Sequence, residues 1–189
     1  MVCLVCHTIT SGRLCPGCAR TLHPTTDRLL AGGLRLVAAF EHQGAARELM
    51  HHLKYRGVLD FADLVAERIA PRVPRLPLVP VPRALSRRLK YGVDPARLLA
   101  QRLASRLGVP VIDILTPHLH TPRRAGRDHS RPVVPFTLRR AVGGEVMLVD
   151  DVVTTGSTVA AAVSAIGRQH LRLVVAANAV PKVSSLSVS

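Results

Sequence analysis

The amino-acid sequence predicts an α/β protein with a mostly parallel sheet, preceded by a small cysteine-rich segment at its N-terminus. Short apolar runs typical of buried strands alternate with segments in which Leu, Ala and Val recur at helical spacing. All four cysteines fall within the first 18 residues, as two close pairs. A length of 189 residues with 48% hydrophobic residues suits one principal domain with a small appendage.

The composition along the chain divides it into four parts. Residues 1–24 are rich in Cys, Thr, Gly and Pro and are expected to form a four-cysteine, zinc-binding knuckle. A connector follows over 25–33, and the main domain is expected over 34–182. The serine-rich tail, 183–189, is predicted to fray.

The first half of the main domain is predicted to contain a strand, two helices and a second strand. The apolar run 34–40 indicates a strand, and apolar residues at helical spacing indicate a helix over 44–55, which Gly57 would end. A second helix is predicted over 61–70, where prolines follow. The proline-punctuated apolar run 76–81 predicts a strand that leads into a special turn.

The next helix has the clearest boundaries. Asp94 is a good N-cap, the following proline suits the first helical position, and Gly108 ends the pattern, so we expect a helix over 95–107. A strand is predicted over 109–115. The arginine-rich stretch 116–143 is predicted to be irregular, and connections of that length inside a compact domain are usually functional or mobile.

The last predicted elements are a strand over 145–149, a helix over 157–169 and a strand over 171–177. Strands that alternate with helices imply parallel pairing. Ligands of such sheets bind beyond the carboxyl ends of the strands, which is where candidate site residues should be sought.

Asp150 and Asp151 follow the apolar run Val146–Val149 directly. Adjacent carboxylates repel each other, so their place at the edge of a sheet needs a reason. They are suited to accept hydrogen bonds from a sugar diol or to bind a hard cation. The alternative is a solvated turn in which one of them caps a helix.

The residues after the acid pair indicate an anion site at the start of a helix. Hydroxyl groups and backbone N–H groups at a helix N-terminus are donors suited to a phosphate, and a glycine lets the backbone approach a ligand closely. No Gly-Lys pair is present, so this is not a Walker A loop. The loop residues are Thr154, Thr155, Gly156, Ser157 and Thr158.

The cysteine pairs have the spacing of a zinc ribbon or knuckle. Cys3 and Cys6 form one Cys-x-x-Cys pair, and Cys15 and Cys18 form the other. Four thiolates satisfy a tetrahedral zinc ion and leave no open position, so the site should be structural. Iron is the chemical alternative.

The formal net charge of +14 comes almost entirely from arginine. Two explanations of this arginine content have equal weight, and both can hold at once. One is the amino-acid bias of a GC-rich genome, and the other is binding to a polyanion such as a phosphorylated sugar or a nucleic acid.

Neither a signal peptide nor an apolar run long enough for a membrane helix is visible. Cysteines confined to one metal-type cluster favour a reducing compartment. A cytoplasmic protein without membrane insertion is therefore expected.

Residues 146–158 resemble the phosphoribosyl-diphosphate signature of type I phosphoribosyltransferases, because strand, acid pair, hydroxyl-rich loop and helix appear in that order. The resemblance implies the parallel-sheet fold of that superfamily and a bound Mg²⁺ with phosphoribosyl diphosphate. By the same resemblance, Asp150 and Asp151 bind the ribose hydroxyls as the catalytic pair. The loop 154–158 holds the 5′-phosphate.

With the cysteine knuckle in front, the chain as a whole resembles the ComF family over about residues 1–180. Three further segments carry this resemblance: Leu53-Lys-Tyr-Arg-Gly57, Val79-Pro-Val-Pro82, and Gly92-Val-Asp-Pro-Ala96. The second segment leads into the diphosphate-binding loop of that family. The resemblance therefore implies diphosphate contacts from Pro82, Arg83, Arg87 and Arg88, and Lys54, Arg56 and Lys90 are further basic candidates.

Two segments depart from the family pattern. Tyr91 stands where the family usually has Arg, and 126–131 replaces a longer motif. Both lie where diphosphate and acceptor should bind, so they bear on transferase turnover more than on phosphoribosyl binding.

ComF-like identity implies a role in competence-linked DNA uptake or single-stranded DNA processing with helicase and recombination partners. The alternative is a catalytically inactive protein that senses a phosphoribosyl compound or nucleotide while it binds nucleic acid or regulates a partner.

Overall fold

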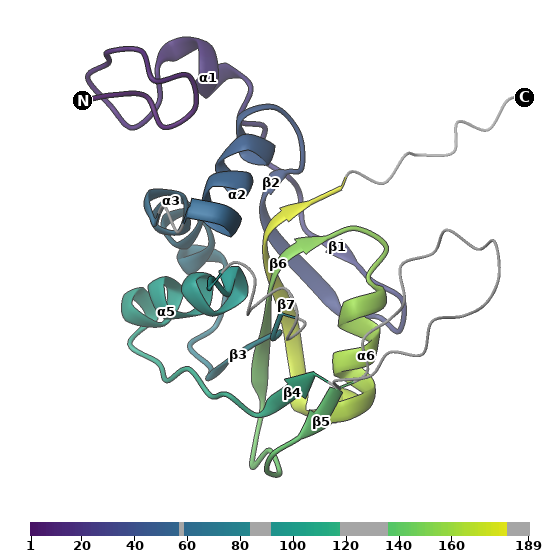
Figure 1. The fold of residues 1–189 in the computed structure, drawn as a ribbon. Coiled ribbons are helices and arrows are strands. Elements are labelled where there is room, and N and C mark those ends of the chain that lie inside the picture. Colours follow the sequence, from purple (N-terminus) through teal and green to yellow (C-terminus); the bar gives the residue numbers. More distant parts are fainter. Residues whose placement is uncertain (57–58, 84–91, 118–135, 181–189) are drawn as a thin grey trace, which may run out of the picture.

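A five-stranded sheet lies at the centre of the computed structural model, which describes residues 1–56, 59–83, 92–117 and 136–180 (Figure 1). The strand order is β1-β2-β7-β6-β3, and β1 alone runs antiparallel to its neighbour. The strands of this sheet are β1 (Arg28–Leu29), β2 (Arg35–Glu41), β3 (Leu78–Pro80), β6 (Val146–Val153) and β7 (Leu171–Ala179). The fold is thus α/β with a mostly parallel sheet, as the alternation of apolar patterns predicts.

Helices cover both faces of the sheet. The helices α2 (Gly44–Arg56), α3 (Asp60–Ile69) and α5 (Pro95–Leu107) contact one face, and α6 (Ser157–Ile166) contacts the other (Figure 1). Two short 3₁₀ turns, η1 (Ala70–Arg72) and η2 (Arg168–His170), follow α3 and α6. A separate antiparallel pair, β4 (Leu115–Pro117) and β5 (Phe136–Leu138), lies near α6.

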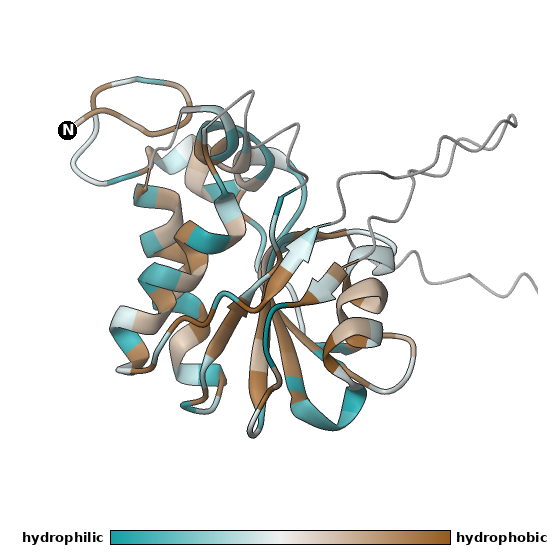
Figure 2. Cartoon of the chain, turned by 60° about the horizontal axis from the view of Figure 1, so that its bottom comes forward, coloured by the Kyte–Doolittle hydropathy of each residue, from teal (hydrophilic) through white to brown (hydrophobic). Residues whose placement is uncertain are grey.

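Alternate residues of the central strands enter two separate apolar clusters. Met147 and Val149 of β6 pack under α2, α3 and α5, whereas Leu148 packs on the α6 side. This period of two is what a strand covered on both faces requires, and it explains why the strands are nearly continuous apolar runs. In Figure 2 the central strands are mostly brown, while the surrounding helices show both colours.

The helix α5 begins and ends where its local signals predict. Asp94 caps it by accepting a hydrogen bond from the backbone N–H of Arg97, and Pro95 is its first residue. Gly108 follows with φ +66°, a left-handed conformation that suits glycine. The boundaries 95–107 are therefore confirmed.

The N-terminal segment packs against α2 and α3. It contains a short helix, α1 (Pro16–Arg20), and an isolated antiparallel bridge between Val2 and Ile9. Arg13 makes an ion pair with Glu67 of α3 at 3.2 Å, and apolar side chains of the segment, such as Leu14, join the cluster under α2 and α3. The cysteine-rich segment is therefore attached to the domain by charge and by packing.

Several predicted elements differ in the structure. The strand predicted over 109–115 is wrong, because only Val111 makes a parallel bridge to Leu78 before β4 begins. Pro110, which has no N–H, contributes only its carbonyl to this contact. The predicted connector contains β1, and the stretch predicted to be irregular contains β5.

The boundaries of two further elements also shift. The last helix ends at Ile166 rather than at 169, since Gly167, with φ 91°, follows it. The strand predicted over 145–149 extends to Val153, so the acid pair lies within β6 and not beyond it. Gly57 and the tail 183–189 lie outside the described residues, and the domain boundaries stay predictions. No helix in the described ranges combines the length and apolar character needed to cross a membrane.

Gly44, the first residue of α2, provides a test of how the N-terminal segment is attached. It has φ +48°, and a Cβ atom there would lie 2.5 Å from the carbonyl oxygen of Thr21. Gly44→Ala should therefore lower the free energy of unfolding by about 1–3 kcal/mol, from backbone strain together with the steric clash. Urea unfolding measures this change. Gly143→Ala is the matched control, because a Cβ there meets nothing within 4 Å and should leave stability unchanged.

Candidate functional site

The carboxyl ends of four neighbouring parallel strands meet at one edge of the sheet. Here Asp150 and Asp151 lie in the last part of β6, Asn178 lies near the end of β7, and His42 follows β2. Arg83 follows β3 by three residues. The topology thus gathers the polar residues at the edge where ligands of parallel sheets bind.

The two acidic side chains of β6 have different surroundings. Asp150 is 7% exposed, and its Oδ1 accepts a hydrogen bond from the backbone N–H of Asp151 at 2.8 Å. The side chain of Asp151 is 23% exposed, and its Oδ1 accepts from the N–H of Val152 at 2.6 Å. Both carboxyl groups are oriented by the backbone of the strand itself.

Burial, and then the charge of Asp151, raise the pKa of Asp150 to about 8. A carboxyl whose pKa is raised in the folded state binds its proton more tightly there than in the unfolded chain, where the pKa is 3.8. Its contribution to stability is therefore full at low pH and is lost as the pH rises to about 8.

Asp150→Asn, which mimics the protonated acid, should remove this pH dependence. Urea unfolding in magnesium-free buffer should show the variant to be more stable than the wild type at pH 8 and above, and the two to converge near pH 4. Asp113→Asn, at an exposed ion pair with Arg97, is the control, and its stability should not separate from that of the wild type in this way. Parallel pH profiles for wild type and Asp150→Asn would contradict a buried, protonated Asp150.

Lys54 of α2 connects the acid pair with the turn after β3. Its Nζ lies 2.9 Å from Oδ2 of Asp151, while its carbonyl oxygen accepts a hydrogen bond from Arg83 at 3.3 Å. Arg83 also donates to the carbonyl of Val93, and its guanidinium lies 5.7 Å from the ring centroid of Tyr55. The three motifs around residues 53–57, 79–82 and 146–158 therefore converge on one place.

The loop after β6 leads directly into α6. Gly156 precedes the helix with φ +83°, and the helix has no side-chain N-cap because this residue is a glycine. Thr155 Oγ1 lies 3.2 Å from Ser157 Oγ and accepts a hydrogen bond from the N–H of Ser157. Thr154, Thr155, Ser157 and Thr158 are exposed, so hydroxyl groups and the positive end of the helix dipole face solvent together.

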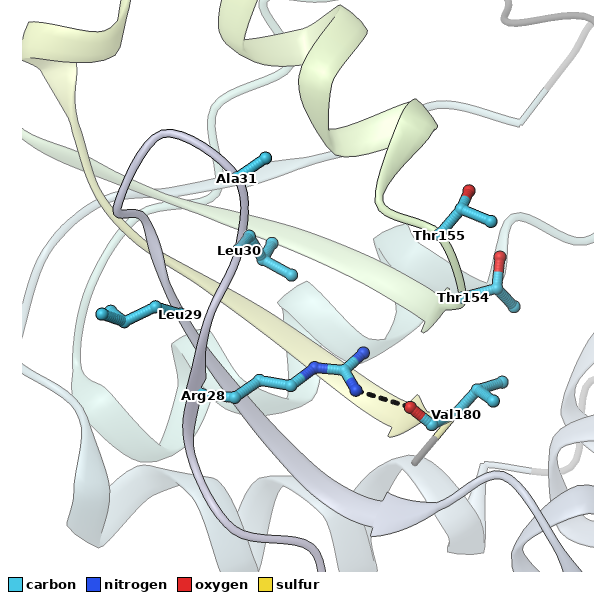
Figure 3. Close-up of a pocket in the computed structure, with 7 residues that line it drawn as sticks. All are labelled: Arg28, Leu29, Leu30, Ala31, Thr154, Thr155 and Val180. Atoms are coloured by element: carbon cyan, nitrogen blue, oxygen red, sulfur yellow. Dashed lines mark hydrogen bonds between the residues drawn. The ribbon is translucent and has the colours of Figure 1, made fainter. Parts of the chain in front are cut away.

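A surface pocket of about 580 Å³ borders this loop (Figure 3). Thr154 and Thr155 line one side of it, and Arg28 to Ala31 line the other. Arg28 extends across the pocket in Figure 3 and donates a hydrogen bond to the carbonyl of Val180 at 2.6 Å. Hydroxyl and guanidinium donors beside leucine side chains suit a ligand with both an apolar part and acceptor oxygens.

Two further residues at this edge, Asn178 and His42, were not predicted as site residues, although the sequence contains an indication of each. Asn178 is the only polar uncharged residue of β7, and it is fully buried. His42 comes directly after β2, which is the position where site residues of a parallel sheet are expected. Their side chains lie 3.1 Å apart, between Asn178 Nδ2 and His42 Nδ1.

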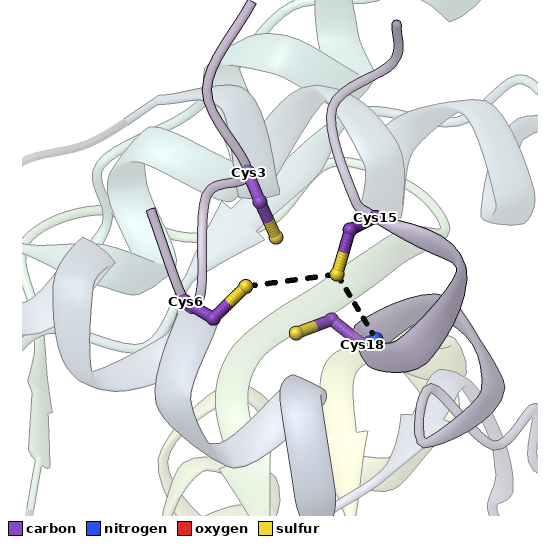
Figure 4. A group of neighbouring side chains, drawn as sticks. All are labelled: Cys3, Cys6, Cys15 and Cys18. Atoms are coloured by element: carbon purple, nitrogen blue, oxygen red, sulfur yellow. Dashed lines mark hydrogen bonds between the residues drawn. The ribbon is translucent and has the colours of Figure 1, made fainter. Parts of the chain in front are cut away.

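The four cysteines come together as the spacing predicts (Figure 4). All four sulfur atoms lie within 4.8 Å of one another, and Cys6 Sγ and Cys15 Sγ are 3.6 Å apart. A tetrahedral zinc ion with Zn–S bonds of about 2.3 Å needs S–S separations of about 3.8 Å, so the cluster fits such an ion. All four thiols are free of disulfide bonds.

The thiol groups of this cluster ionise unequally. Burial opposes ionisation of Cys3, but hydrogen bonds from the backbone N–H groups of Cys15 and Cys6 lower its pKa to about 6. Burial and the neighbouring thiols raise the pKa of Cys18 to about 12. A divalent cation among the sulfur atoms would favour the thiolate form of all four.

Several basic residues predicted from the sequence to contact the ligand belong to segments that the structure does not describe. Arg87, Arg88, Lys90, Tyr91 and the segment 126–131 lie outside the described residues, as does the side chain of Arg56. Pro82 and Arg83 are described and lie half-buried after β3. The described guanidinium contacts of Arg83 hold neighbouring backbone together, and its role toward a diphosphate stays a prediction.

Several solved structures match this chain. The structure of a purine phosphoribosyltransferase from Pyrococcus horikoshii Ot3 matches 63% of this chain and 70% of its own, with 20% sequence identity and a TM-score of 0.40. No protein-family model matches the chain. No curated protein sequence matches it either.

Proposed function

We propose that the carboxyl edge of the sheet binds a phosphoribosyl compound, phosphoribosyl diphosphate in the first instance. The observation that carries the proposal is the acid pair of β6, which is followed within three residues by a hydroxyl-rich loop that opens α6. This combination offers acceptors for a sugar diol beside donors for a phosphate. A site for a phosphate group alone would not need the two carboxyl groups.

The residues would divide the ligand between them. Asp151 and Asp150 would hold the 2′- and 3′-hydroxyls of the ribose. Because burial raises the pKa of Asp150, its protonated form can also donate a hydrogen bond. The N–H groups and hydroxyls of 154–158 would hold the 5′-phosphate.

The ammonium group of Lys54 would move away from Asp151 when the ligand binds, and it would then neutralise part of the ligand's charge. Mg²⁺ carried with the diphosphate would neutralise negative charge on the leaving group. The protein's own contribution to transfer would be positioning and electrostatic stabilisation of an oxocarbenium-like sugar. For the molecule that would accept the phosphoribosyl group, the candidate position among the described residues is the pocket beside Arg28.

Isothermal titration of the zinc-loaded chain with phosphoribosyl diphosphate tests this function. We expect one site per chain, with an affinity that falls when Mg²⁺ is omitted. Inorganic diphosphate and ribose 5-phosphate are the control ligands, and each should bind more weakly than the complete compound. No heat of binding in any of these titrations would rule the proposal out.

The alternative of a sensor without turnover differs in one measurable outcome. A transferase releases diphosphate when a suitable acceptor is added, whereas a sensor binds the same ligand and releases none. A diphosphate-release assay across nucleobases and related heterocycles therefore separates the two. The altered segments at Tyr91 and 126–131 favour binding over turnover.

A second proposed function is the one that the ComF resemblance implies, namely a cytoplasmic role in DNA uptake or single-strand processing with helicase and recombination partners. The observation that favours nucleic-acid binding is the net charge of +14. Aromatic residues make up only 3% of the chain, so affinity should be mainly electrostatic. Fluorescence anisotropy with a single-stranded oligonucleotide should show affinity that falls steeply with salt. An absence of binding at low salt would exclude a direct role.

A further inference from the structure

Asn178 stands out as a polar side chain inside a buried strand. It is 0% exposed, and its neighbours in β7, from Val174 to Ala179, are apolar. Burying an amide side chain costs free energy that an apolar residue would not. The hydrogen bonds of such a buried amide should therefore show what it does.

The hydrogen bonds of Asn178 fix its orientation. Its Nδ2 donates to the carbonyl oxygen of Ala46 at 2.9 Å, and a carbonyl oxygen can only accept. The same Nδ2 lies 3.1 Å from His42 Nδ1. The amide nitrogen therefore has to face both partners, and Oδ1 remains buried without a hydrogen-bond partner in the described part of the chain.

This orientation determines the tautomer of His42. Because Asn178 donates to Nδ1, that nitrogen carries a lone pair, and the imidazole proton is on Nε2. A protonated imidazole would place two N–H groups against each other at this contact. The neutral form with Nε2–H is thus the form that the contact selects.

The surroundings of His42 also favour its neutral form. Burial, followed by the charges of Lys54 and Arg47, lowers the pKa of His42, and the charge of Asp151 opposes them. The half-buried ring follows β2 at the edge that holds the acid pair. His42 is consequently a neutral hydrogen-bond donor beside Lys54 and Asp151.

We propose that the Nε2–H of His42 donates a hydrogen bond to an oxygen of the anionic ligand bound over Asp150 and Asp151, and that Asn178 is the positioning residue that fixes the tautomer. This inference rests on the proposed phosphoribosyl site. It adds a ligand contact from β2 and a supporting residue from β7 to the residues of β6. The positive charges of Lys54 and Arg47, which both act on His42, make this edge suited to an anionic oxygen.

The tautomer is tested without any ligand by long-range ¹H–¹⁵N correlation spectra of the imidazole groups. We expect His42 in the Nε2–H form in the wild-type chain. In Asn178→Asp the carboxylate would accept a hydrogen bond, so the proton should move to Nδ1 or the ring should become charged. A wild-type His42 in the Nδ1–H form would overturn the inference, whatever the protein binds.

The ligand contact is tested by two replacements of His42. His42→Asn retains an acceptor for Asn178 but lacks the distal N–H, and it should bind phosphoribosyl diphosphate with Mg²⁺ about tenfold more weakly. His42→Gln restores a distal N–H, and it should recover most of the affinity. Thermal unfolding of both variants checks that they fold.

Each outcome of the titration decides something. Wild-type affinity in His42→Asn would overturn the contact, and an equal loss in both variants would assign His42 to packing alone. If the wild-type chain does not bind phosphoribosyl diphosphate, the proposed function and this contact both fail. The NMR result would then still show whether Asn178 sets the tautomer.

Discussion

The double replacement Asp150→Asn, Asp151→Asn is expected to weaken binding of phosphoribosyl diphosphate by about 100-fold. A hydrogen bond from a sugar hydroxyl to the charged Asp151 is worth about 1.5–3 kcal/mol, and one that involves Asp150, whose pKa is raised by burial, is worth about 0.5–1.5 kcal/mol. The two contacts together amount to roughly 3 kcal/mol, which corresponds to about a hundredfold in affinity. Isothermal titration with Mg²⁺ measures the loss.

The matched control for this variant is Asp113→Asn, which changes an exposed carboxylate away from the edge of the sheet. It should bind the ligand like the wild type. The double variant should remain folded, since Asp150→Asn relieves a buried carboxyl of its cost of ionisation. Unchanged affinity in the double variant would remove the acid pair from the site.

Replacement of one cysteine of the knuckle, in Cys15→Ser, is expected to abolish tight metal binding. Structural zinc sites bind with apparent free energies of about 10–16 kcal/mol, and this segment of 24 residues has little apolar core of its own. Cys3 is its only buried apolar residue. Metal analysis should show about one ion per wild-type chain and none in the variant.

Hydrogen exchange should locate the effect of this replacement. Amides of residues 1–24 should lose their protection in Cys15→Ser, while those of β6 and β7 should keep theirs, because these strands are paired on both sides in the sheet and the knuckle adds only partly buried side chains to the cluster that covers them. Thr8→Ala, beside Cys6 but not a ligand, is the control and should retain the ion. Metal content equal to the wild type in Cys15→Ser would contradict a four-cysteine site, and the element found distinguishes zinc from iron.

The sequence predicts those parts of the fold whose signals are local. Asp94, Pro95 and Gly108 determine both ends of α5 without help from the rest of the chain. The apolar runs around Leu148 and Val174 likewise predict the two central strands. The cluster of cysteines is predictable for the same reason, since each pair forms within a few residues.

Elements that depend on a distant partner could not be predicted in this way. The two-residue strand β1 exists because it pairs with β2, and β5 exists because it pairs with β4. The strand expected over 109–115 reduces to a bridge at Val111, and its last residue, Leu115, pairs instead with Leu138 in the β4–β5 ladder. A short apolar run in the sequence does not indicate whether a partner strand is present in the fold.

The same limit applies to the candidate site. The acid pair and its loop are contiguous, so their motif is visible in the sequence. The ion pair of Lys54 with Asp151 and the contact of His42 with Asn178 join residues that are far apart along the chain. Only the fold brings them to one edge of the sheet. Asn178, as a lone amide in an apolar strand, was the available signal for the second contact.

A crystal structure of the metal-loaded chain with phosphoribosyl diphosphate and Mg²⁺ is the most direct test of the proposed ligand site. We expect the 5′-phosphate against the backbone N–H groups of 154–158, the ribose hydroxyls at Asp150 and Asp151, and an anionic oxygen within hydrogen-bond distance of His42 Nε2. A ligand bound elsewhere, with solvent alone around the acid pair and the loop, would contradict it.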